Sequence, residues 1–244
     1  MALSMTPGDR IVPQRFYFYA LVCAALAVFA GFSKSYFLKG LFGTPALYPL
    51  LHLHGLVMSS WFVLFGGQTL LIQRHRSDVH RRLGVVGVLL AATMVAVGSA
   101  VVIVNAREGR VPPGAPIPVI VILSFSNLAV FGALVGAAIC FRRRSEFHKR
   151  FMLLATLSLL PAAFQRMPLD FLGLGVLPTV FGLTDVFILV CLAYDTWRHR
   201  RLHPAFAAGA ILAIAWVPLA IVLGGSSAWD HFATWLIGSV KLTT

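Results

Sequence analysis

The chain has 244 residues, of which 59% are hydrophobic and 11% are charged, and its net charge is +12. Soluble domains contain roughly 45–50% apolar and about 25% charged residues, so this composition predicts apolar surface that faces lipid. Three cysteines exclude a small domain held together by disulfides. The positive charges lie in short clusters between apolar runs, which is typical of membrane topology and not of nucleic-acid binding.

A membrane-spanning helix needs about 20 mainly apolar residues. Seven segments meet this requirement: 16–33, 47–72, 82–104, 117–141, 150–166, 176–196 and 204–224. The joints between them are short, so we expect residues 1–244 to form a single domain. The sequence therefore predicts an all-α integral membrane bundle of seven transmembrane helices. Residues 226–240, which contain two tryptophans, are expected at a membrane interface.

The distribution of Lys and Arg predicts the orientation of the bundle. The N-terminal region and residues 74–82, 142–150 and 197–203 carry fourteen of these residues, and the rest of the chain carries six. Positive charge accumulates on the cytoplasmic side. We therefore expect the N-terminus inside and the C-terminus outside, in a multi-pass protein of the inner (plasma) membrane.

Two of the basic joints repeat each other at an offset of 68 residues. Residues 74–83 read RHRSDVHRRL, and residues 142–151 read RRRSEFHKRF. Each string has a serine and an acid that can cap a helix N-terminus, followed by a histidine, His80 or His148. Two interpretations stay open. The strings are either ordinary helix caps with basic flanks, or the mark of a duplicated helix pair that brings two equivalent histidines to one depth as a ligand pair.

The segment 47–72 has one polar and aromatic face. Residues at spacings of four and three lie on a single side of a helix and are expected to face inwards: His54, Met58, Trp61, Phe65 and Gln68. His54 falls in the outer half of the membrane by this count.

Three further polar residues also fall in the outer half, namely Asp185, Arg166 and Asn127. An aspartate at mid-membrane costs several kcal/mol unless it is neutral or paired, so it marks a function by default and faces the interior. We expect Asp185 to have Arg166 or His54 as its partner, either in a proton-handling site or in a pair that only fixes packing. Asp185, Arg166 and Asn127 are thus the candidate catalytic residues.

Two polar residues belong to the basic joint near residue 200. Asp195 is expected to form an interfacial salt bridge with the adjoining cluster Arg198, Arg200 and Arg201. His203 shares its expected membrane level with His80 and His148, so a zinc site of three histidines is conceivable, although the arginines would repel a dication.

The motifs occur in an order that resembles a known group of proteins. Residues 54–58 read HGLVM, residues 80–84 read HRRLG, and residues 148–152 read HKRFM. Together they resemble a group of uncharacterised bacterial multi-span membrane proteins. More distantly, the second to fifth segments are similar to the transmembrane di-haem b-type cytochromes that pass electrons from ascorbate across membranes.

The cytochrome resemblance implies a cofactor and its ligands. His80 and His148 match the haem pair on the cytoplasmic side, as cofactor-binding and metal-ligating residues. His52 or His54 matches one half of the outer pair, but the fourth segment has no histidine for the other half. The resemblance therefore implies one haem b near the cytoplasmic face, with the outer polar residues as a quinol site.

Three functions remain open at this point. The protein is an electron carrier with one haem, a cofactor-free accessory subunit of a larger membrane complex, or a proton-coupled transporter that uses Asp185. The segments 16–33 and 204–224, nearly free of polar residues, would suit docking to a complex. The sequence has no HExxH, P-loop, Rossmann glycine string or serine elbow, and whether the protein is an enzyme stays open.

Overall fold

The computed structural model describes residues 7–111 and 116–238, and all regular secondary structure in them is helical. The helices are α1 (Pro7–Phe32), η1 (Ser33–Phe37), α2 (Pro49–Gln73), α3 (Ser77–Arg107), α4 (Ile117–Cys140), α5 (Ser145–Leu157), α6 (Pro161–Phe164), η2 (Asp170–Leu172), α7 (Val176–His199), α8 (Pro204–Gly224) and α9 (Ser227–Ile237). In the described part of the chain, six helices are long and apolar enough to cross a membrane: α1 with η1, α2, α3, α4, α7 and α8. The all-α class and the integral membrane character are therefore confirmed.

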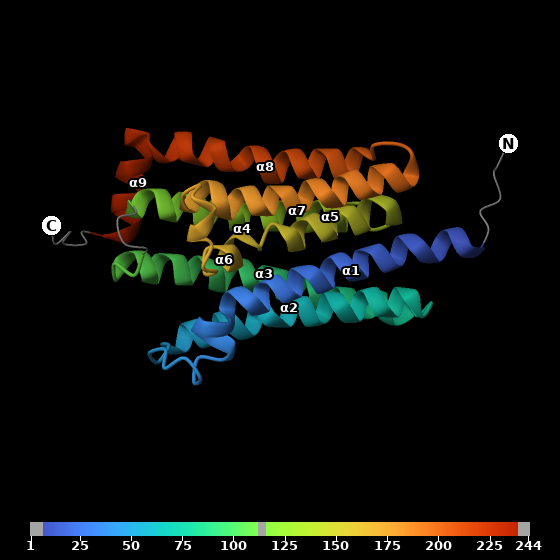
Figure 1. Cartoon of the computed structure of the whole chain (residues 1–244), viewed down its shortest axis with the longest axis horizontal. Helices are drawn as coiled ribbons and strands as arrows, with labels where there is room; N and C mark the ends of the chain where they lie inside the picture. The colour runs from blue at the N-terminus through green and yellow to red at the C-terminus, as the bar shows by residue number, and fades with distance from the viewer. Residues whose placement is uncertain (1–6, 112–115, 239–244) are drawn as a thin grey trace.

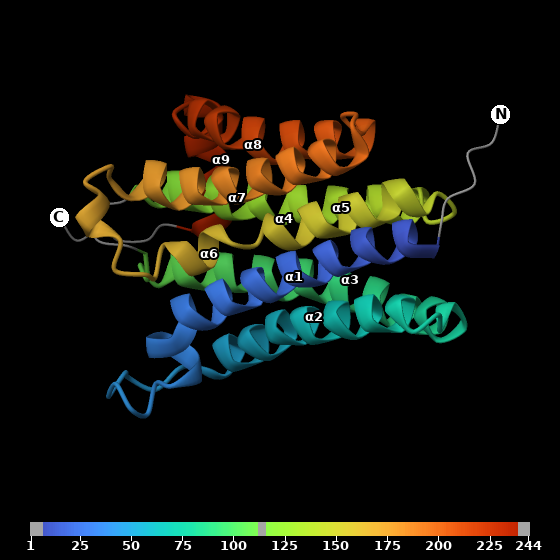
Figure 2. The same cartoon turned by 45° about the vertical axis from the view of Figure 1, so that its right-hand side comes forward.

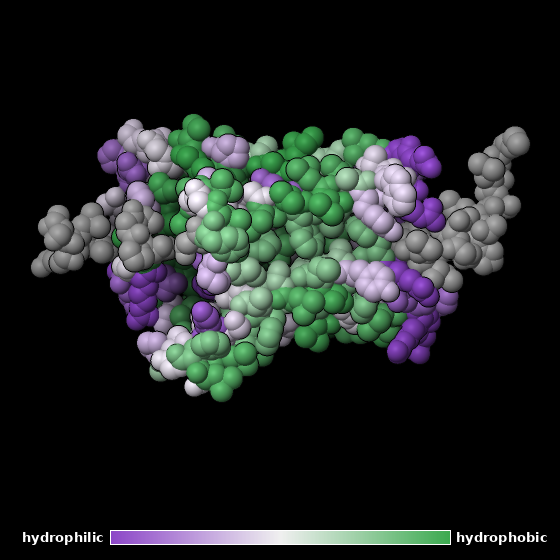
Figure 3. Space-filling model, in the orientation of Figure 1, coloured by the Kyte–Doolittle hydropathy of each residue, from purple (hydrophilic) through white to green (hydrophobic). Residues whose placement is uncertain are grey.

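The long helices run side by side along the long axis of the molecule (Figures 1 and 2). The α2–α3, α4–α5 and α7–α8 turns meet at one end, which we call the basic end, and α9 lies at the other. The three basic joints predicted to share one side of the membrane thus do share one end of the bundle. Hydrophobic residues cover the middle of the visible face, and hydrophilic ones gather towards both ends (Figure 3). This pattern suits a lipid belt between two aqueous phases.

The main core draws buried residues from α1, α2, α3, α4, α5, α7 and α8, and Trp61 of α2 is one of its largest side chains. The Trp61 side chain is 2% exposed, and its ring packs edge-on against Phe131 with centroids 5.1 Å apart. Its indole Nε1 donates to Thr156 Oγ1 at 3.1 Å, which satisfies the one polar atom of a buried aromatic ring. Phe65 is also buried, so the predicted inward face of α2 is confirmed.

The segment 150–166, expected to be one helix, is divided in two. The α5 helix ends at Leu157 and α6 begins at Pro161, with a turn between them. Proline lacks an N–H and clashes with the carbonyl four residues earlier, so it ends the helix that precedes it. Because α5 alone has 13 residues, it is too short to count as a seventh span by length.

The two repeated strings begin α3 and α5 at equivalent positions. Ser77 and Ser145 are the first helical residues, and neither helix has a side-chain capping hydrogen bond. The predicted serine caps are therefore wrong. The acids Asp78 and Glu146 lie in the first turn, where the helix dipole favours negative charge.

The C-terminal region forms α9, which packs across the ends of α3 and α4. Trp229 Nε1 donates to the Pro118 carbonyl at 2.8 Å, and Arg107 donates to the Leu236 carbonyl at 2.9 Å. Ala233 is fully buried. This helix is thus part of the bundle and covers one of its ends.

Candidate functional site

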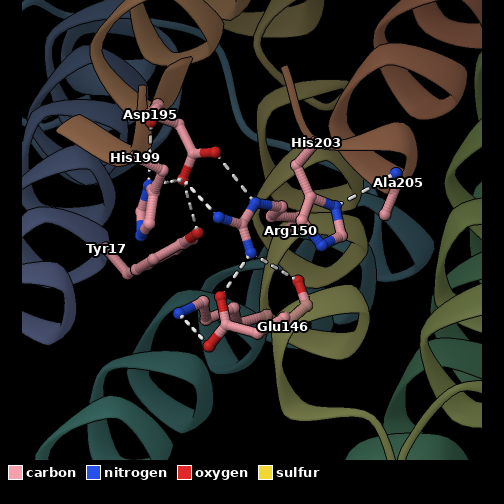
Figure 4. Close-up of polar contacts among 8 residues, drawn as sticks. Tyr17, Glu146, Arg150, Asp195, His199, His203 and Ala205 are labelled. Carbon is pink, nitrogen blue, oxygen red and sulfur yellow. Dashed lines mark hydrogen bonds and ion pairs between the residues drawn. The ribbon is translucent and has the colours of Figure 1, made fainter. Parts of the chain in front are cut away.

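A buried ion pair joins α5 to α7 at the basic end (Figure 4). The Arg150 and Asp195 side chains are each 1% exposed. Arg150 Nε donates to Asp195 Oδ2, and Arg150 Nη2 donates to Asp195 Oδ1, both at 2.9 Å. This two-pronged geometry is the strongest form of a carboxylate–guanidinium contact.

Three neighbours complete the hydrogen bonding of this pair (Figure 4). The Tyr17 hydroxyl of α1 donates to Asp195 Oδ1 at 3.2 Å. Arg150 Nη1 donates to Glu146 Oε2 at 2.7 Å and to the Glu146 carbonyl at 2.8 Å. The His199 ring lies 2.8 Å from the Asp195 carbonyl. The cluster therefore ties together α1, α5 and α7, three helices far apart in sequence.

The sequence prediction for Asp195 named the wrong partner. It forms a salt bridge, but with Arg150 and not with the Arg198, Arg200 and Arg201 cluster. The reason is the helical face, because Asp195 continues the buried row of Ile188 and Cys191. The spacings of three and four residues between Ile188, Cys191 and Asp195 were the signal in the sequence that Asp195 lies on the buried face of the helix.

His203, at the same end, is the N-cap of α8. Its Nδ1 accepts a hydrogen bond from the Ala205 N–H at 3.2 Å (Figure 4), and its ring packs edge-on against Phe147. Burial, together with the nearby Arg150 charge, lowers the pKa of His203 below its usual value. A ring nitrogen without a proton is what the cap requires, so this histidine has a structural role.

The two histidines of the repeat face each other. The His80 ring of α3 and the His148 ring of α5 have centroids 6.2 Å apart and planes at 86°. The structure thus brings together the two histidines that the interpretation as a duplicated helix pair placed at one depth, in the first turns of two helices. Gln68, the last residue of the inward face of α2, lies against His80.

The hydrogen bonds of the two rings determine where their protons lie. His148 Nδ1 lies 2.9 Å from the Ala138 carbonyl; a carbonyl only accepts, so this Nδ1 carries the proton and Nε2 keeps its lone pair. In the amide orientation that satisfies both of its polar atoms, Gln68 donates to His80 Nδ1 at 2.7 Å. The neutral His80 ring then carries its proton on Nε2.

With these tautomers, only one of the two histidines has a ring nitrogen free to bind a metal ion. His148 Nε2 can act as a ligand, but a protonated His80 Nε2 cannot. Among the described residues, no group of three or more His, Cys, Asp or Glu is placed to hold a metal ion. The three-histidine zinc site is therefore not assembled, and the histidine pair as it stands does not fit a bis-histidine haem.

The outer polar residues do not form one site. His54 Nδ1 is buried and has no hydrogen-bond partner among the described residues, and the Arg166 charge lies close enough to act on it. Arg166 lies over the Phe32 ring, 4.4 Å from its centroid, and donates to the Ala162 carbonyl. In the described part of the chain, neither residue forms a hydrogen bond or an ion pair with Asp185, so the expected pair is not formed.

Asp185 and Asn127 instead line a small, partly open cavity of about 20 Å³, and both side chains are half-buried. It lies between α4, α7 and α8, at the turn that separates α5 from α6. Its polar lining residues are Ser126, Asn127, Ser158, Thr184, Asp185 and Trp216. The sequence analysis did not identify Ser158 or Trp216 as lining residues. Pro161 was an available signal for Ser158, because it marks the helix break that places Ser158 at the cavity.

Comparisons of this chain with protein-family models, with curated proteins and with solved structures find no match.

Proposed function

We propose that this chain is a seven-span protein of the inner membrane that moves protons, and that Asp185 takes up and releases each proton. The observation that carries the proposal is an aspartate in the middle of a spanning helix that lines a small cavity with Asn127. No described residue pairs with its carboxylate by an ion pair or a hydrogen bond. An intramembrane carboxylate that merely fixed packing would need such a partner.

The seventh span in this proposal is α5, the following turn and α6 taken together. They run in line along the bundle (Figure 2), and Leu153, Leu157 and Leu160 are fully buried. A broken helix is tolerated at membrane depth where its backbone is buried in protein or lines a cavity. Broken helices in transporters commonly mark the ion site, which fits the position of Ser158.

With the basic end in the cytoplasm, as the Lys and Arg count indicates, the loop at residue 109 faces outwards. In a variant without the three native cysteines, we expect Gly109→Cys to react with an impermeant maleimide on intact cells. Ser145→Cys should react only after the cells are opened. Labelling of position 145 from outside would reverse the proposed orientation.

Removing the charge of Asp185 tests the function directly. Purified protein in liposomes with an enclosed pH dye should admit protons when a potassium diffusion potential is applied. Asp185→Asn keeps the shape of the side chain but cannot carry a proton, so we expect the proton flux to fall roughly 100-fold. Asp230→Asn, on the exposed face of α9, is the matched control and should leave the flux unchanged.

Two results would overturn this proposal. One is a wild-type flux no higher than that of protein-free liposomes, and the other is equal fluxes in wild type and Asp185→Asn. Equal fluxes would favour the accessory-subunit hypothesis, which gives Asp185 no role in proton movement.

A haem-based electron carrier is a second candidate, because His80 and His148 face each other from matched positions. It requires the Gln68 amide to turn, so that its oxygen accepts from His80 Nδ1 and frees Nε2. A reduced-minus-oxidised spectrum of the purified protein should then show a b-type band. His80→Ala and His148→Ala should each abolish the band, and His75→Ala, in the exposed joint, should not. A wild-type spectrum without this band would rule the candidate out.

A further inference from the structure

The hydroxyl groups around the Asp185 cavity donate their hydrogen bonds to backbone carbonyls, so they cannot donate into the cavity. Ser126, Ser158 and Thr184 each donate to a carbonyl three or four residues earlier in the chain, at 2.8–3.0 Å. This is the usual local bond of such side chains in helices. Their oxygens therefore enter the cavity as hydrogen-bond acceptors, like the Asp185 carboxylate.

One lining residue is a donor that lacks an acceptor. Trp216 Nε1 is buried and has no partner among the described residues, although the side chain borders the cavity. An indole N–H can only donate. A buried donor left unpaired costs about 1–3 kcal/mol, so such a group indicates an acceptor that belongs at this position.

From this arrangement we infer that the cavity binds one water molecule, which accepts a hydrogen bond from Trp216 and donates to Asp185, and that the ion bound there is a proton and not Na⁺. This deepens the proposed function and rests on it for its biological meaning. The size is suitable, because a water needs at least roughly 10–15 Å³ and two to four polar partners, and the cavity measures about 20 Å³. A sodium ion would meet the positive end of the indole N–H dipole, which disfavours a cation at this position.

The chemical step is a simple proton transfer. A hydronium formed at this water gives one proton to an Asp185 oxygen, so one O–H bond breaks, one forms, and a neutral water remains. Release is the reverse.

Most of the helices around the cavity carry no charged residue near it. Within the described residues, the helices α4, α6 and α8 contain no charged side chain. The charged residues of α5 (Glu146, Lys149 and Arg150) lie in its first two turns, where they pair with one another or with Asp195. The charged residues of α7 other than Asp185 lie in its last two turns, and Arg166, beyond the end of α6, lies over the Phe32 ring.

Carbodiimide labelling read by mass spectrometry tests the inference, because a hydrophobic carbodiimide reacts with a protonated carboxyl group. Asp185 of the purified full-length protein should be labelled at low pH and protected at high pH. Replacing choline chloride by NaCl at constant ionic strength should leave the profile unchanged. Trp216→Phe removes the N–H that holds the water, and through it the carboxylate, so the half-labelling pH should rise by about 1 unit.

One further variant serves as a control, and another provides a second test of the inference. Trp197→Phe removes a tryptophan that is 67% exposed on α7 and should leave the profile unchanged. Asn127→Leu removes the other N–H donor of the cavity and should shift the profile in the same direction as Trp216→Phe, which provides a second test if Trp216→Phe does not fold. Protection of Asp185 by NaCl, an unshifted profile in both variants, or no labelling at any pH would overturn the inference. A normal labelling profile without proton flux would instead overturn only the proposed function.

Discussion

Asp195→Ala is expected to lower the free energy of unfolding by about 3–5 kcal/mol, because it leaves Arg150 buried with its main counter-charge removed. Arg150 and Asp195 are each 1% exposed, so water cannot replace the lost carboxylate. The Tyr17 hydroxyl loses its acceptor in the same variant. Denaturant or thermal unfolding of the purified protein in detergent measures the loss.

The double variant Arg150→Met with Asp195→Leu measures what the ion pair contributes to the free energy of unfolding, separately from the cost of leaving one buried charge unpaired. Removing both charges leaves no uncompensated group, so most of the lost stability should return. Lys149→Ala breaks a more exposed contact with Glu146 and should cost less than about 1 kcal/mol. If Asp195→Ala were as mild as Lys149→Ala, the buried pair would not hold these helices together.

Gly31→Ala is expected to cost about 1–3 kcal/mol or more, because a Cβ at this position would overlap the backbone of Ala163. The contact joins α1 to α6, the short helix after the break that borders the Asp185 cavity. A neighbouring backbone cannot turn aside as a flexible side chain can. We therefore expect both a lower unfolding midpoint and an altered labelling profile of Asp185.

Gly67→Ala is the matched control for this glycine. It also lies in a long helix, but a Cβ there meets nothing within 4 Å. Alanine favours helix over glycine by about 1 kcal/mol, so this variant should be neutral or slightly more stable. Equal destabilisation in both variants would show that the effect of Gly31 is not one of close packing.

The features of the site that could be predicted from the sequence were those that depend only on where a residue lies along its own helix. The face of α2 from Met58 to Gln68 followed from spacing alone, because residues three and four apart share a side of any helix. The meeting of His80 and His148 was one of the two interpretations that the repeat left open, since two similar strings that begin two helices at one end of the bundle reach the same depth. The expected pairing of Asp185 with Arg166 or His54 was wrong, because such a pairing depends on how each helix is rotated about its axis.

The sequence by itself determined that this is an all-α membrane protein, where its apolar helices lie, and which joints share an end of the bundle. These features depend on hydropathy and on backbone hydrogen bonds within one segment, which act over about 20 neighbouring residues. Only the tertiary structure decided that Arg150 binds Asp195 and that Trp216 and Asp185 border one cavity. Those contacts join residues from different helices, and side-chain packing selects among the many pairings that the same hydropathy pattern allows.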